Sequence, residues 1–118
     1  LLDNYNNGNH WTSSMIKITG FSTVNGNGTG MILETYGLID LTKVTADNNT
    51  NTGLGAISHN GAIMLTCGSM TNNNDGWNLS AFTTITLKGV FSTANLNLDE
   101  DYSLPAGVPI VTRNCPLP

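Results

Sequence analysis

Hydrophobic and polar residues alternate along several short segments of this chain, which predicts β-strands. In residues 83–91, Ile85 and Leu87 fall on one face and Thr86 and Lys88 on the other. Asn, Thr and Gly interrupt every stretch before it could complete three helical turns, so helices are not expected. The predicted strands are residues 15–19, 29–36, 38–45, 62–70, 83–91 and 108–113.

Clusters of Asn and Gly separate these segments and predict turns and long polar loops. Asn25-Gly26 and Asn60-Gly61 are dipeptides typical of two-residue hairpins. The expected fold is therefore all-β, an antiparallel β-sandwich or a small jelly-roll-like domain, formed as a single domain by residues 1–118. A faint similarity between residues 20–25 and 89–95 is attributed to chance in so biased a composition.

The chain contains few charged residues and many small polar ones. Charged residues make up 10% of the chain, against about 25% in an ordinary domain, while 17 residues are Asn, 16 are Thr and 13 are Gly. The net charge is −4, and the few cations are widely spaced, which argues against nucleic-acid binding. No apolar run approaches the roughly 18 residues of a membrane span, so membrane insertion is not expected. Strands with so little charge indicate either an obligate oligomer, whose copies cover the strand edges and faces, or an extracellular or virion protein, in which low charge is usual.

The two cysteines allow one disulfide at most. Cys67 lies in an apolar segment and Cys115 in a tail flanked by proline, and the sequence favours two free thiols over a bridge. Their spacing is not that of a metal site, and neither a metal nor a cofactor is expected.

Two tryptophans occur beside groups that could bind sugar hydroxyls. Trp77 follows Asn74 and Asp75, and Trp11 follows His10. Sugars are recognised by this mixture, because an aromatic ring stacks on the sugar ring while amides and carboxylates bond its hydroxyls. These five residues are the predicted ligand-binding site. The alternative is that each Trp anchors its loop on the core.

Catalysis is not expected from this sequence. Glu34 and Glu100 are the only glutamates, and their spacing does not indicate the facing carboxylate pair that a glycosidase needs. His10 and His59 have no recognisable nucleophile motif beside them. A small polysaccharide-degrading enzyme that uses Glu34 is kept as a third alternative.

The composition and strand rhythm resemble the C-terminal tip domains of trimeric bacteriophage tail fibres and related bacterial surface adhesins. The resemblance implies an extracellular homotrimer at the end of a stalk, on a virion or a bacterial surface, that binds a cell-surface glycan or protein receptor. Residues 1–8 would then be a stalk junction, and the start without Met indicates a fragment or processed product. The main alternative is a structural β-sandwich subunit of a capsid or surface assembly.

Overall fold

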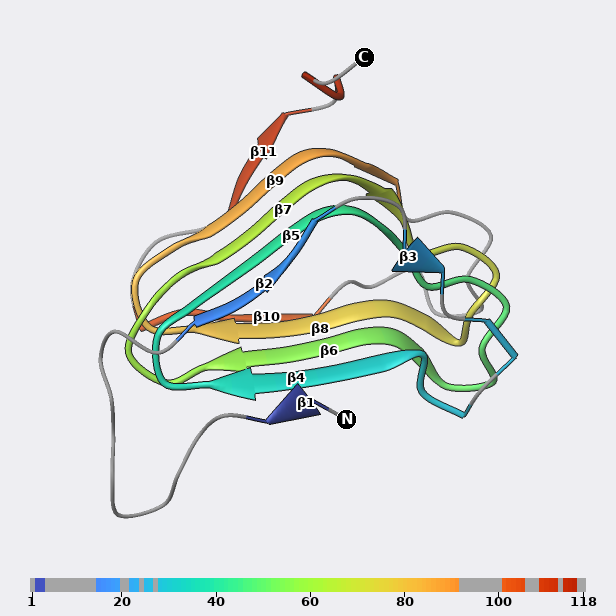
Figure 1. The fold of residues 1–118 in the computed structure, drawn as a ribbon, viewed down its shortest axis with the longest axis horizontal. Helices are drawn as coiled ribbons and strands as arrows, with labels where there is room; N and C mark the ends of the chain where they lie inside the picture. The colour runs from blue at the N-terminus through green and yellow to red at the C-terminus, as the bar shows by residue number, and fades with distance from the viewer. Residues whose placement is uncertain are drawn as a thin grey trace.

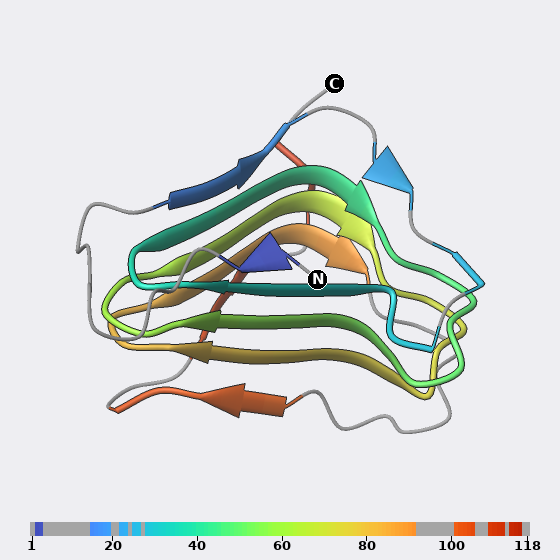
Figure 2. The same ribbon diagram turned by 60° about the horizontal axis from the view of Figure 1, so that its bottom comes forward.

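The computed structural model describes residues 2–3, 15–19, 22–23, 25–26, 28–91, 101–105, 109–112 and 114–116, and it forms a β-solenoid of about 3 turns. Two sheets, each made of parallel strands, face each other (Figures 1 and 2). Sheet 1 contains, in spatial order, β1 (Leu2–Asp3), β4 (Met31–Thr35), β6 (Thr52–Ser58), β8 (Asp75–Ala81) and β10 (Asp101–Ser103). Sheet 2 contains β11 (Ile110–Thr112), β9 (Ile85–Phe91), β7 (Ile63–Ser69), β5 (Leu38–Thr45) and β2 (Met15–Ile18), and β3 (Ser22–Thr23) also pairs with β5.

Each coil of the solenoid contributes one strand to each sheet, as β4 and β5, β6 and β7, and β8 and β9 do in turn. In sheet 1, residue 33 pairs with residue 56 and residue 56 with residue 79, a step of 23 residues. In sheet 2, residues 41, 65 and 87 follow one another at steps of 24 and 22. The chain is therefore built from coils of 22 to 24 residues that differ slightly in length.

The expected antiparallel sandwich or jelly roll is wrong, because every strand pair is parallel. The dipeptides that predicted hairpins lie at corners of the solenoid. Their backbone hydrogen bonds go to the neighbouring coil, from Gly26 N to Asn48 O at 3.3 Å and from Asn60 N to Tyr36 O at 2.7 Å. These turns move the chain from one sheet to the other and do not fold it back beside its own strand.

The core lies between the two sheets and is made of stacked columns of similar residues. Alternation along each strand points every second side chain inward, and the parallel register places equivalent side chains of successive coils on top of one another. One column of sheet 2 consists of buried isoleucines only: Ile16, Ile39, Ile63 and Ile85. Leu33, Ala56 and Leu79 form a buried column of sheet 1. The repeated sequence pattern thus produces a continuous apolar interior.

Asparagines form a hydrogen-bonded ladder at the corner that leads from sheet 2 to sheet 1. Asn49 and Asn73 are buried, at 4% and 3% exposure. Asn73 Nδ2 donates to Ala46 O at 2.9 Å. Asn48 and Asn72 have φ of 57° and 59°, a backbone conformation that asparagine tolerates better than most residues. Much of the asparagine in the chain therefore serves the turns of the solenoid.

In-register stacking also explains the low charge. Strands in a sheet lie about 4.8 Å apart. A charged residue repeated in every coil would therefore be repelled by like charges at that distance. Thr42 pairs with Thr66, and Asn72 Nδ2 donates to Asn48 Oδ1 at 2.6 Å. Uncharged polar residues can stack on themselves in this way, so strands with few charges are compatible with the parallel register.

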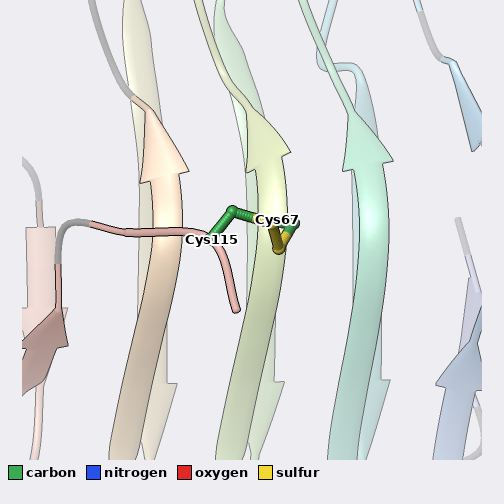
Figure 3. Close-up of a disulfide and its surroundings, with 2 residues drawn as sticks. All are labelled: Cys67 and Cys115. Atoms are coloured by element: carbon green, nitrogen blue, oxygen red, sulfur yellow. A yellow bond between two sulfur atoms is a disulfide. The ribbon is translucent and has the colours of Figure 1, made fainter. Parts of the chain in front are cut away.

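A disulfide joins Cys67 and Cys115, with their Cα atoms 5.1 Å apart, so the expected free thiols are wrong. Lys43, Cys67 and Gly89 occupy equivalent places in successive coils, have φ of 56°, 53° and 63°, and form a stacked bulge. The segment that carries Cys115 crosses β9 to reach β7 (Figure 3). It passes over Gly89, where a Cβ atom would collide with the Cα and N atoms of Cys115.

Candidate functional site

Trp77 does not form a surface site. It lies in the middle of β8, pairs with Leu54 of β6, and is 5% exposed within the apolar core. Its ring cannot stack on a sugar from this position. The position agrees with the alternative that this tryptophan is an anchor in the core.

Of the other predicted site residues, Asn74 and Asp75 are described, and they lie next to each other where β8 begins. Asn74 is exposed at a corner, where its backbone N donates to Asn51 O at 2.8 Å. Asp75 begins β8 and is half-buried, and its Oδ1 accepts no hydrogen bond from the residues that the structure describes. His10 and Trp11 lie outside the described residues, as does most of the proposed stalk junction.

The outer face of sheet 1 carries a hollow that sequence analysis did not identify. Gly55 pairs with Ile32 of β4 and Asn78 of β8. Because glycine has no side chain, it leaves a gap between these two larger residues. The hollow encloses about 310 Å³ and is lined by Thr29, Ile32, Leu33, Glu34, Thr52, Gly55, Ala56, Ile57, Asn78 and Ser80.

A second hollow lies beside the first and shares Ile57 and Ser80 with it. It encloses about 280 Å³ and is lined by Ile57, Ser58, His59, Ser80, Ala81, Phe82, Ser103, Leu104 and Pro105. Phe82 is 54% exposed at this hollow, directly after the end of β8. Together the two hollows cross four neighbouring strands, β4, β6, β8 and β10, and we call them the sheet 1 groove.

An ion pair lies where the two hollows meet. His59 Nε2 is 2.6 Å from Glu34 Oε1, and the two side chains are 32% and 27% exposed. Glu34 points outward from β4, and His59 follows β6 at the start of the next corner. The solenoid brings them together because they are 25 residues apart, close to the length of one coil.

Among the described residues, the lysines lie on one sheet only, whereas carboxylates lie on both, with Glu34 on β4 and Asp40 on β5. Lys17, Lys43 and Lys88 all lie on strands of sheet 2, although they are far apart in the sequence. In the described part of the chain, Glu34 is the one carboxylate that lines the sheet 1 groove, and no lysine or arginine lines it. The groove is therefore acidic or neutral.

The groove combines an exposed aromatic ring, exposed aliphatic side chains, hydroxyls, an amide and one carboxylate. Such a surface can bind a ligand that has apolar faces and many hydroxyl groups. Sequence analysis missed Gly55, Phe82 and Ser80 as site residues, because the coil register that brings them together was not recognised. Among the described residues, no group of three or more His, Cys, Asp and Glu side chains could hold a metal ion.

Comparisons with known proteins identify no relative of this chain. No protein-family model matches the chain, and no curated protein or solved structure is significantly similar to it. Within the part that the structure describes, no helix has the length and apolar character to cross a membrane.

Proposed function

We propose that this chain is a non-enzymatic recognition module of an extracellular surface fibre or adhesin, and that it binds a cell-surface glycan in the sheet 1 groove. The observation that carries the proposal is the exposed ring of Phe82, which lies in one groove with the hydroxyl of Ser80 and the carboxylate of Glu34. Phe82 supplies the stacking surface that the sequence-based interpretation assigned to Trp77.

Two further features support this proposal. A β-solenoid holds its outer side chains on a sheet of hydrogen-bonded strands, which provides a rigid binding surface. The Cys67–Cys115 disulfide supports a place outside the cytoplasm, because disulfides persist in oxidising compartments. A homotrimer, as the resemblance to fibre tips implies, would raise the avidity of weak single sites, and light scattering tests it separately.

The proposal is tested with a glycan array and with titration of the glycans that bind. We expect Phe82→Ala to weaken binding about fivefold or more, because a stacking ring contributes about 1 kcal/mol beyond simple contact. Ile110→Ala is the matched control, since Ile110 is 56% exposed on β11 of the other sheet. Blank arrays for the wild type, or equal binding by Phe82→Ala, would contradict the proposal.

A structural subunit of a surface assembly is the second candidate function. β11 is the last strand of sheet 2 in the described part of the chain, and Val111 on it is 60% exposed. A free parallel edge of this kind can accept a strand of another chain. Open-ended assembly in light scattering, together with absence of glycan binding, would favour this second function.

A further inference from the structure

We propose that the sheet 1 groove selects uncharged oligosaccharides and rejects sialylated or sulfated ones, with Glu34 as the residue that determines this specificity. This inference rests on the proposed function, since it concerns the ligand of the same groove. It goes further by naming the chemical class of the glycan.

The hydrogen-bonding capacity of Glu34 is the first argument. An ionised carboxylate only accepts hydrogen bonds, so it pairs with sugar hydroxyls or amide N–H groups and not with carboxylate or sulfate oxygens. Oε1 is bonded to His59 Nε2. Oε2 accepts no hydrogen bond from any other described residue, and the side chain is 27% exposed, so this oxygen can accept one from a ligand.

The charge of the Glu34–His59 pair is the second argument. If the imidazole is neutral, the pair carries one negative charge, and if it is protonated, the pair carries none. The pair is not positive in either state. An anionic sugar in the groove therefore faces repulsion or no attraction, and it loses hydration without gaining an ionic partner.

The location of the cations is the third argument. The lysines that could bind an acidic sugar, Lys17, Lys43 and Lys88, are on the strands of sheet 2. Figure 2 shows the two sheets as separate layers, so the outer face of sheet 1 is turned away from β5, β7 and β9. No lysine of the described residues lines the groove to compensate a carboxylate or sulfate on the ligand.

The arrangement of the two hollows favours an extended ligand. They share Ile57 and Ser80, so a ligand can run from the gap over Gly55 to the ring of Phe82. The Glu34–His59 pair lies at the junction, where it meets the middle of such a ligand. A charge on a central sugar unit would therefore be rejected most strongly.

The test uses the whole chain and pairs of glycans that share one core and differ only by a sialic acid or a sulfate. We expect each anionic derivative to bind at least about tenfold more weakly than its neutral parent at low salt. With a neutral imidazole, added salt should narrow this ratio, because it screens the repulsion between the Glu34 carboxylate and the anionic sugar. In Glu34→Gln, which keeps the size and an acceptor oxygen, the ratio should fall below about threefold.

The outcomes separate the two proposals. If anionic derivatives bind the wild type as well as their neutral parents do, or if Glu34→Gln leaves the ratio unchanged, the specificity inference is overturned while glycan binding stands. If no glycan of either class binds, the proposed function itself fails. Glu34→Lys gives a second measurement, because it should make the anionic derivatives the better ligands.

Discussion

Asn73 Oδ1 accepts two hydrogen bonds from Asn49 of the preceding coil, one from its backbone N and one from its side-chain Nδ2, both at 2.9 Å. This pair connects consecutive corners of the solenoid inside the protein, where water is excluded. The side chains that sequence analysis considered as sugar ligands in this segment are therefore close to a structural ladder. Asparagine ladders of this kind stabilise stacked parallel strands in register.

Asn73→Ala is expected to lower the free energy of unfolding by about 3 kcal/mol, because it removes three buried hydrogen bonds. Urea denaturation followed by circular dichroism measures the change. Asn74→Ala is the matched control, since this neighbouring side chain is exposed, and it should change stability by less than about 0.5 kcal/mol. Equal effects of the two variants would contradict a structural ladder.

Reduction of the disulfide is expected to destabilise the protein by about 4 kcal/mol, as chain entropy predicts for cysteines 48 residues apart. Denaturation with and without reductant measures this difference. The double variant Cys67→Ala/Cys115→Ala should be about as stable as the reduced wild type and should not respond to reductant. A wild type that does not respond either would show that the bridge contributes nothing.

Gly89→Ala is expected to interfere with the disulfide. A Cβ atom at this position would collide with the backbone of Cys115, and the φ of 63° costs about 1–2 kcal/mol for a residue other than glycine. We therefore expect thiol titration to detect free thiols in this variant. We also expect its free energy of unfolding to fall by about 2 kcal/mol or more. In a protein that already carries Cys67→Ala/Cys115→Ala, Gly89→Ala should lower the free energy of unfolding by less, since only the backbone strain remains.

Gly55→Val is expected to abolish glycan binding without loss of stability. The nearest atom to a Cβ at Gly55 is Met31 O at 4.0 Å, so a side chain fits there and fills the hollow. Valine also suits a strand better than glycine, which could raise stability by up to about 1 kcal/mol. Glycan titration and thermal unfolding measure the two effects, with Thr66→Val on the outer face of sheet 2 as the control. Undiminished binding by Gly55→Val would place the ligand elsewhere.

The strands of sheet 2 could be predicted from the sequence, and those of sheet 1 largely could not. Residues 38–45, 62–70 and 83–91 alternate clearly and correspond to β5, β7 and β9. β6 contains two glycines, and β8 begins with Asp-Gly, which predicts turns in an isolated segment. These residues are tolerated because neighbouring coils supply the hydrogen bonds and the register.

The parallel arrangement was missed because the repeat is uneven. The corner between β4 and β5 contains Tyr36 and Gly37, whereas the corner between β6 and β7 runs from residue 59 to residue 62. Such differences move the period between 22 and 24 residues and conceal it in a single sequence. The same irregularity concealed the Glu34–His59 pair, which only the register of β4 and β6 brings together.

Each coil of this protein forms hydrogen bonds mainly with the coils on either side of it. The number of coils can therefore change without altering the fold of the others. Thr52 and Asp75 hold equivalent places in successive coils. A second copy of residues 52–74 inserted before Asp75 would therefore extend the stack by one strand spacing, about 4.8 Å, and leave the surrounding geometry intact. Duplication of single coils thus offers a simple route by which such a chain could grow, and by which an engineer could lengthen its groove.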